Sequence, residues 1–177
     1  MQYGLCYLSV VALRSEASDK SELISQVLYG DYFKVLEHRK SWSRIRLGFD
    51  KYEGWIDNKQ FQFIDELKYK ELHKSDPLMT TDLVDFITNQ EQQLHPILLG
   101  SSLNGLSHLD HAFEGAKAIG SKDKSKLVET ALLYLNTPYL WGGKTPFGID
   151  CSGFVQMVYK LNGYNILRDA SQQASQG

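Results

Sequence analysis

The stretch 137–156, TPYLWGGKTPFGIDCSGFVQ, places a glycine-rich loop directly before a predicted helix. The helix is expected to begin at 150–152 and to end near Gly163. Its apolar residues recur at helical spacing and are expected on one face: Phe154, Val155, Val158 and Leu161. Cys151 therefore lies in the first turn, where free N–H groups and the helix dipole stabilise a thiolate over a thiol.

A thiolate is the nucleophilic form of cysteine, so this position suits covalent catalysis. The glycines of the loop allow a backbone to approach a bound peptide, and nearby N–H groups can stabilise an oxyanion. A lone cysteine is a weak signal, and the alternative is that Cys151 is a small buried hydrophobe. Cys6 lies in a predicted strand, where we expect it in the core.

A second helix is predicted before the loop, from Ser125 to about Asn136. Its apolar residues also recur at helical spacing: Leu127, Val128, Ala131, Leu132 and Leu135. Pro138 disfavours a helical conformation at Thr137, so the helix should stop there.

Residues 1–65 contain short apolar runs separated by turn residues. Between Trp42 and Leu47 the pattern alternates, with Arg44 and Arg46 on one face and Ser43 and Ile45 on the other. This period of two predicts a half-buried strand. About five such strands in this length predict a small barrel or sandwich.

Two resemblances rest on these motifs. The runs 11–14, 21–22, 30–31, 42–45 and 52–56 together resemble a bacterial SH3 domain spanning residues 1–65. The pair Tyr139-Leu-Trp-Gly-Gly and Asp150-Cys-Ser-Gly-Phe resembles the signature of the NlpC (p-sixty) family of papain-like cysteine peptidases, over residues 118–177.

The resemblances imply an α+β fold, in which SH3-like barrels precede the helical N-terminal part of a papain-like domain. Between them, residues 66–117 are expected to form a connector and a second, degenerate SH3-like module. The peptidase part is expected to be incomplete, because its helices lack a sheet to pack against.

The peptidase resemblance implies a role for several residues. Cys151 matches the nucleophile, and Tyr139 matches a tyrosine that donates a hydrogen bond on the oxyanion side. Asp150 matches the acid that receives the free amino end of the substrate. Ser171, in the segment Arg168-Asp-Ala-Ser-Gln-Gln, matches a serine that helps to hold this amine.

In relatives with SH3 modules the barrel closes the substrate pocket, and Glu22 and Tyr52 occupy the matching positions. The alternatives are a solvated turn residue for Glu22 and packing at the barrel rim for Tyr52. Ser152, beside the nucleophile, and Trp141, in the loop, complete the candidate substrate-binding set, although packing is the alternative for Trp141.

The family precedent is hydrolysis of the γ-D-glutamyl-diamino acid bond in peptidoglycan peptides that begin with a free L-Ala. A buried ammonium is well paired by carboxylates, whereas an acylated N-terminus would leave them unsatisfied. The resemblance therefore implies a cysteine endopeptidase of muropeptide recycling that needs no cofactor. A metal is not expected, because the spacing of His108 and His111 around Asp110 is a weak signal without further ligands.

A cysteine peptidase needs an oriented base, yet all five histidines precede Cys151: His38, His73, His95, His108 and His111. Three explanations stay open. The chain is a fragment of a longer protein that carries the histidine, or it is circularly permuted with His108 or His111 as base, or it is a decayed enzyme. The last explanation makes it a non-catalytic module that binds muropeptides or cell wall.

The charge and hydropathy of the chain limit the partners that it is expected to bind. The net charge of −2, without a basic run, argues against nucleic acid. No apolar stretch approaches the roughly 20 residues of a membrane span. The N-terminus lacks the basic region of a secretory signal, and two cysteines make no disulfide framework, so we expect a cytoplasmic protein.

Overall fold

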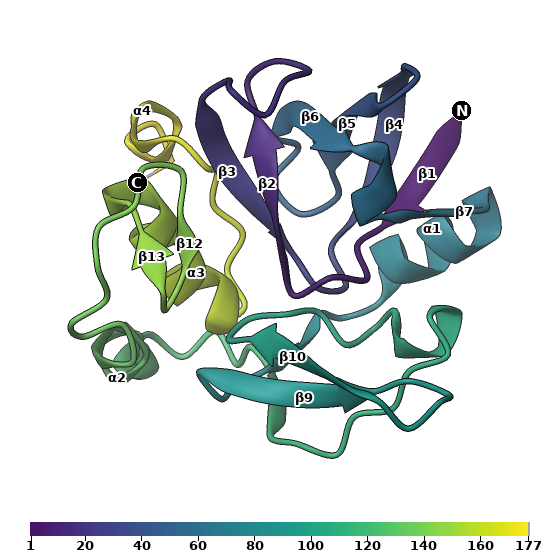
Figure 1. The fold of residues 1–177 in the computed structure, drawn as a ribbon. Helices are drawn as coiled ribbons and strands as arrows, with labels where there is room; N and C mark the ends of the chain where they lie inside the picture. Colours follow the sequence, from purple (N-terminus) through teal and green to yellow (C-terminus); the bar gives the residue numbers. More distant parts are fainter. Residues whose placement is uncertain (177) are drawn as a thin grey trace.

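The computed structural model describes residues 1–176, and it begins with a strongly curved antiparallel sheet (Figure 1). Along this sheet the strand order is β3-β2-β6-β5-β4-β1-β7. The strands are β1 (Gln2–Leu5), β2 (Val10–Arg14), β3 (Leu23–Leu28), β4 (Tyr32–His38), β5 (Trp42–Leu47), β6 (Glu53–Asp57) and β7 (Gln62–Ile64). A short 3-10 turn, Asn58–Gln60, joins the last two.

The inner face of this sheet is filled by alternate residues of its strands. In β5, Ser43, Ile45 and Leu47 are buried while Arg44 and Arg46 are exposed, which confirms the predicted period of two. Cys6 is fully buried in the same core, as predicted. The N-terminal sheet has seven strands where about five were predicted, and the whole chain has the predicted α+β composition.

Residues 66–119 lie below the curved sheet in Figure 1. They form α1 (Glu66–Lys74), β8 (Leu78–Thr80), β9 (Val84–Thr88), β10 (Leu94–Leu98), a 3-10 turn (Leu106–His108) and β11 (Lys117–Ile119). The strands pair as β8 with β11 and β9 with β10, in two separate sheets. Ile87 and Ile97 share a core with Tyr3 and Leu5 of the first sheet and with Tyr29 of the turn after β3, so this segment is packed onto the barrel. Its identity as a second SH3-like module stays a prediction.

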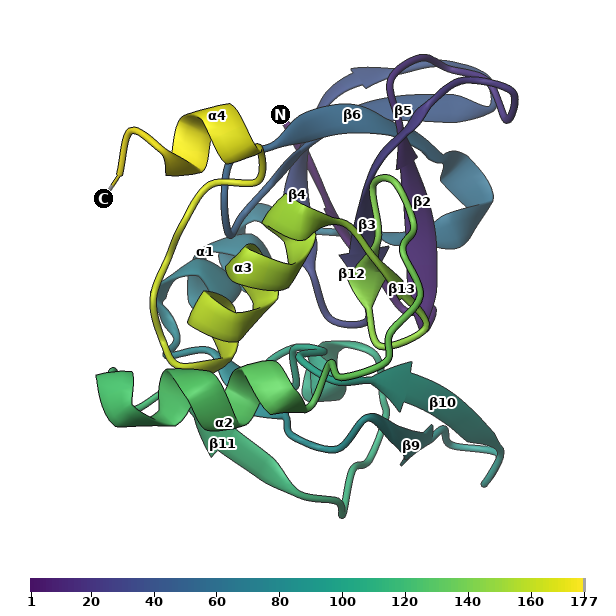
Figure 2. The same ribbon diagram turned by 90° about the vertical axis from the view of Figure 1, so that its left-hand side faces the viewer.

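The C-terminal segment contains a 3-10 turn (Lys124–Lys126), α2 (Leu127–Leu132), β12 (Lys144–Thr145), β13 (Gly148–Ile149), α3 (Cys151–Leu161) and α4 (Ala170–Gln173). Figure 2 shows α3 between the barrel strand β3 and α2. Among residues 1–176, no helix has the length and apolar character needed to cross a membrane.

The helix predicted from Ser125 to Asn136 is shorter than expected. After α2 ends at Leu132, the next turns are tight, with N–H groups bonded to carbonyls three residues back. Asn136 has a φ of 66°, a left-handed conformation that no α-helix can continue through. Only part of the predicted apolar stripe is buried, because Leu127 packs inward while Val128 is 69% exposed.

Helix α3 begins and ends as predicted, but its buried face is rotated. Met157 is fully buried beside Val158, whereas Val155, expected on the inner face, is 37% exposed. The buried core that Met157 joins includes Leu28 of β3 and Leu99. The helix that carries Cys151 is therefore anchored directly on the barrel.

We predict that Met157→Ala lowers the free energy of unfolding by about 2–5 kcal/mol, because it leaves a cavity where α3 meets β3. Urea denaturation measures this loss. Val155→Ala on the same helix is the matched control, with an expected change within about 0.5 kcal/mol. Equal losses in the two variants would contradict the observed orientation of the helix.

Candidate active site

Cys151 is the first residue of α3 and is exposed to solvent. It opens onto a cavity of about 330 Å³, a volume in the range of small-molecule sites. The cavity brings together residues from the barrel, the loop, α3 and the C-terminal segment: Glu22, Ile24, Tyr52, Trp141, Asp150, Cys151, Ser152, Arg168, Asp169, Ala170 and Ser171. All predicted site residues except Tyr139 lie around it.

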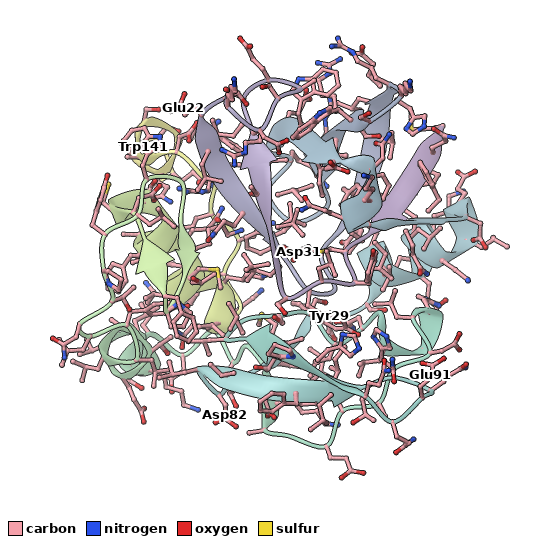
Figure 3. All side chains as sticks on the ribbon, viewed as in Figure 1. Glu22, Tyr29, Asp31, Asp82, Glu91 and Trp141 are labelled. Carbon is pink, nitrogen blue, oxygen red and sulfur yellow. The ribbon has the colours of Figure 1, made fainter. Side chains whose placement is uncertain are left out.

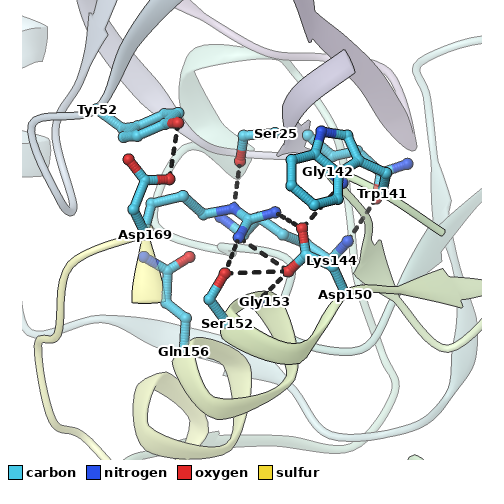
Figure 4. A network of polar contacts seen from close by, with 12 residues as sticks. Ser25, Tyr52, Trp141, Gly142, Lys144, Asp150, Ser152, Gly153, Gln156 and Asp169 are labelled. Carbon is cyan, nitrogen blue, oxygen red and sulfur yellow. Dashed lines mark hydrogen bonds and ion pairs between the residues drawn. The ribbon is translucent and has the colours of Figure 1, made fainter. Parts of the chain in front are cut away.

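Asp150 is the N-cap of α3, and its carboxylate organises the surroundings of Cys151 (Figure 4). One oxygen accepts hydrogen bonds from Gly153 N at 2.6 Å and from Ser152 Oγ at 3.2 Å. The other accepts from Gly142 N at 2.9 Å. Both oxygens also accept from Arg168, at 3.0 and 2.7 Å. The carboxylate is thus saturated, since its two oxygens offer about four lone-pair sites.

The charge of Asp150 is maintained by these donors. Burial alone would raise the pKa of Asp150, but the hydrogen bonds from Arg168 and Gly153 N outweigh it and hold the pKa below its usual value. The carboxylate is therefore ionised at neutral pH.

Arg168 is 1% exposed and connects three parts of the fold. Besides its paired bonds to Asp150, its guanidinium donates to Ser152 Oγ at 2.9 Å and to Ser25 Oγ of β3 at 3.0 Å. Two parallel N–H groups of the guanidinium match the two oxygens of the Asp150 carboxylate. Because Ser25 belongs to the barrel, Arg168 fixes the N-terminus of α3 relative to the SH3-like part.

The barrel forms one wall of the cavity through two side-chain contacts. Trp141 Nε1 donates to Glu22 Oε1 at 2.7 Å, and Figure 3 shows the two residues at the boundary between barrel and loop. Tyr52 OH donates to Asp169 Oδ1 at 2.9 Å. Burial and this bond to a carboxylate raise the pKa of Tyr52 well above its usual value, so the phenol stays protonated.

Gly142 shows why the loop needs glycine where it meets the barrel. Its φ is +77°, and a Cβ atom at this position would lie 2.4 Å from the carbonyl oxygen of Leu23. A side chain would therefore both strain the backbone and push the loop away from β3. The same residue donates its N–H to Asp150, which ties the loop to the helix N-terminus.

Sequence reasoning missed Arg168 and Asp169 as site residues. Both stand in the quoted segment Arg168-Asp-Ala-Ser-Gln-Gln, of which only Ser171 was assigned. The sequence does not show that Arg168 pairs with Asp150, because the two residues are 18 positions apart. Asp169 also caps α4, a position where a sequence pattern predicts only a structural role.

Tyr139 is the predicted residue that the cavity does not include. Its side chain is 67% exposed, and its backbone forms a parallel bridge with Ile149. Its role beside an oxyanion stays a prediction.

None of the histidines lines the Cys151 cavity. His111 Nδ1 is 3.0 Å from Tyr29 OH, and His108 lies 3.5 Å from Glu71. Tyr29 belongs to the core shared by the barrel and the middle segment, and Glu71 belongs to α1, so neither residue predicted for a permuted enzyme stands beside Cys151. Within residues 1–176, no group of three or more His, Cys, Asp or Glu side chains has the arrangement of a metal site.

The fold and site define a class of protein in which an SH3-like barrel forms one wall of a cysteine-centred cavity. Comparison with known families agrees with this description. Residues 13–61 match the bacterial dipeptidyl-peptidase SH3 domain, and residues 136–177 match the NlpC/P60 family. The two segments thus match the two families that the sequence resembles, which confirms both resemblances.

Curated relatives match the chain over half of their length or more. The chain is 27% identical to dipeptidyl-peptidase 6 of Lysinibacillus sphaericus, over 89% of this chain and 69% of the relative. It is 28% identical to the gamma-D-glutamyl-L-lysine dipeptidyl-peptidase of Bacillus subtilis (strain 168), over 86% of this chain and 58% of the relative. For the protein of the same name in Bacillus cereus, the shared part is half of the relative.

Solved structures confirm the fold. An NlpC/P60 family protein from Bacillus cereus superposes with a TM-score of 0.75 at 17% identity, covering 99% of this chain and 77% of the other. An NlpC/P60 endopeptidase from Photobacterium damselae subsp. piscicida gives 0.70 at 16% identity, covering 97% and 45%.

We predict that iodoacetamide alkylates Cys151 in the native protein and spares Cys6. Cys151 is exposed, whereas burial raises the pKa of Cys6 far above its usual value and removes it from solvent. Peptide mass spectrometry after timed alkylation measures both rates. Cys151→Ser is the control and should abolish the fast labelling; comparable labelling of the two thiols would contradict the described environments.

Arg168→Met should lower the free energy of unfolding by about 3–5 kcal/mol at neutral pH, because it leaves the Asp150 carboxylate buried without its cation. Urea denaturation measures the loss. Arg46→Met, which removes an exposed ion pair with Glu53, is the matched control, with an expected loss below about 1 kcal/mol.

The same pair predicts a pH dependence. The pKa of Asp150 is lowered in the folded state, so the stabilisation is present above the usual carboxyl pKa and is lost as the pH falls through the lowered value. The difference between wild type and Arg168→Met should therefore shrink below about pH 4. A difference that stays constant down to about pH 2.5 would contradict this assignment.

Proposed function

We propose that this chain is the substrate-recognising part of a cysteine endopeptidase that hydrolyses γ-D-glutamyl-diamino acid bonds in peptidoglycan peptides with a free N-terminal L-Ala. The observation that carries the proposal is the cavity that Cys151 shares with Glu22 and Tyr52 of the barrel. The names of the Lysinibacillus and Bacillus relatives support the same type of reaction.

The charge of the cavity supports recognition of an ammonium group. Its lining contains three carboxylates, Glu22, Asp150 and Asp169, and one guanidinium, that of Arg168. Asp150 is saturated by five hydrogen bonds, two of them from Arg168. The excess negative charge therefore belongs to Glu22 and Asp169, and we assign the ammonium to these two acids rather than to Asp150.

Each of these acids keeps capacity for a ligand. Glu22 accepts one hydrogen bond, from Trp141, and Asp169 accepts one from Tyr52 and one from the backbone N–H of Gln172 in its capping box. These neutral donors orient the carboxylates without neutralising them. An ammonium between the two acids would gain charge-assisted hydrogen bonds, whereas an acylated nitrogen would leave two carboxylates uncompensated.

This placement sets the site of cleavage. In the proposed placement, the amine of L-Ala lies against Glu22 and Asp169, and the γ-carbonyl of the next residue lies at Cys151 Sγ. The thiolate attacks this carbonyl, and N–H groups at the start of α3 stabilise the oxyanion. A base takes the thiol proton and returns it to the leaving amine, and water then hydrolyses the acyl-thioester, which releases a dipeptide.

A non-catalytic muropeptide-binding module is the second candidate. It is favoured by one observation, that no histidine among residues 1–176 lines the Cys151 cavity. The two candidates share the ammonium site and differ only in turnover.

We further propose that the protein acts in murein peptide recycling in the cytoplasm. The support is the chemistry of its cysteines, since both are free and Cys151 is exposed. An exposed thiol that must stay reduced suits a reducing compartment. Cell fractionation with an antibody against the chain tests this, and a signal confined to the envelope fraction would overturn it.

The ammonium site is tested by calorimetric titration of the Cys151→Ala variant with L-Ala-γ-D-Glu-L-Lys. We expect the N-acetylated tripeptide to bind at least about a hundredfold more weakly, and Glu22→Gln or Asp169→Asn to weaken the free tripeptide about tenfold or more. Asn retains the capping role at position 169. Glu16→Gln, an exposed acid of the barrel, is the control. Equal affinity for the two tripeptides would exclude the proposed amine recognition.

Turnover is tested on the longest protein that the reading frame encodes. Release of L-Ala-γ-D-Glu from the tripeptide, followed by mass spectrometry, should be abolished by Cys151→Ala. Binding without release in the wild-type protein would establish the binding module instead. Release that persists in Cys151→Ala would refute the assigned nucleophile.

A further inference from the structure

The loop that leads into β12 runs along the barrel strand β3 (Figure 2). Trp141 and Gly142 contact the barrel around the start of this strand. Further along the loop, the backbone N–H of Lys144 donates to Gln26 Oε1 at 2.7 Å. Trp141 is 60% exposed, so this end of the loop has little buried surface of its own to hold it in place.

The side chain of Lys144 reaches away from the Cys151 cavity. It is 2% exposed and lines a separate cavity, of about 310 Å³, where the barrel, the middle segment (residues 66–119) and the C-terminal segment meet. Among the described residues, none lines both cavities. Lys144 therefore lies outside the Cys151 site, although the loop to which it belongs forms part of that site.

Two buried carboxylates of the barrel lie near the Lys144 ammonium. Asp31, 9% exposed, precedes β4, and Asp50, 4% exposed, lies in the turn before β6. Figure 3 shows Asp31 at the junction between the barrel and the segment below. Burial lowers the pKa of Lys144, and the charges of Asp50 and Asp31 oppose this effect. Since Asp31 also pairs with Lys160 at 3.5 Å, two lysines and two carboxylates balance at this junction.

Asp50 is the carboxylate that matches Lys144. It accepts hydrogen bonds from two neutral groups, Gln156 Nε2 at 2.8 Å and the backbone N–H of Tyr52 at 3.0 Å. Gln156 is a fully buried residue of α3, and Tyr52 belongs to the barrel wall of the Cys151 cavity. The negative charge of Asp50 thus stays available to Lys144, while the same carboxylate contacts both the helix and the barrel wall.

We propose that Lys144 is a positioning residue, whose buried ammonium is held by Asp50 and Asp31 and fixes the loop that leads into β12. Through Trp141 this loop orients Glu22, so the consequence for substrate binding rests on the proposed function. A buried ion pair adds little net stability over apolar side chains of similar volume, because desolvation offsets the attraction. It does define a position, since the attraction depends on the distance between the charges, whereas apolar burial is non-directional.

The test removes both charges of the pair and keeps the size of the side chains. Lys144→Met alone leaves the Asp50 carboxylate without its cation and should lower the urea midpoint by about 1 M or more. The double variant Lys144→Met/Asp50→Asn has no lone charge, and its midpoint should return to within about 0.5 M of wild type. A double variant as unstable as Lys144→Met would contradict the pairing itself.

The order of the loop is measured by amide hydrogen exchange in the 177-residue chain. The N–H groups of Gly142 and Gly143 are both hydrogen-bonded, and they should exchange about tenfold faster or more in the double variant. The N–H of Met157 in α3 should exchange at the wild-type rate. Lys124→Met, which removes an exposed lysine of the same segment, is the control and should leave all three rates unchanged.

The effect on the site is measured by calorimetric titration with L-Ala-γ-D-Glu-L-Lys. In the Cys151→Ala background, the double variant should bind this tripeptide about tenfold more weakly, because Trp141 no longer holds Glu22 in place. Faster exchange in the loop with unchanged affinity would overturn the positioning role.

The two measurements separate this proposal from the proposed function. Wild-type exchange of Gly142 and Gly143 in the double variant would overturn the role of Lys144, whether or not the tripeptide binds. Failure of the Cys151→Ala protein itself to bind the tripeptide would refute the proposed function, and the exchange rates would then decide the role of Lys144 by themselves.

Discussion

The buried pair of Asp150 and Arg168 is the interaction on which the rest of the site depends. Asp150 caps α3 and holds the loop through Gly142, while Arg168 reaches across to Ser25 of the barrel. A pair of this kind is costly to bury and tolerates little change in geometry, because either charge left alone would be strongly destabilising. It therefore fixes the position of Cys151 relative to the SH3-like wall.

This constraint explains why the barrel is part of the site. A helix N-terminus makes a cysteine thiol reactive, but it does not select a substrate. In the proposed function, specificity comes from the opposite wall, where Glu22 and Tyr52 meet Trp141 and Asp169. Because Met157 and Leu28 share one core, the helix and the barrel cannot separate without exposing buried apolar surface. The barrel wall of the cavity and Cys151 are thereby held in one rigid frame.

The two cavities use buried charge in different ways. Around Cys151, carboxylates exceed cations, which suits an ammonium. At the junction of the three segments, the buried ammonium of Lys144 lies near the buried carboxylates of Asp31 and Asp50. Both follow from the same principle, that a charge removed from water must be paired.

The sequence by itself determined the local features, which are the alternation of β5, the start of α3 at Cys151 and the loop glycines. These features could be predicted because strand period, helix capping and turn chemistry depend on only a few neighbouring residues. It also identified the two family motifs, whose residues are contiguous.

Only the tertiary structure decided which face of α3 is buried, since Val155 and Met157 are both apolar and packing against Leu28 selects one. It alone brought Arg168 to Asp150 and Tyr52 to Asp169, which lies 117 positions away, because a charge pair leaves no periodic pattern in the chain. For the same reason the partners of the histidines, and the buried state of Lys144, were decided by the fold and not by local sequence.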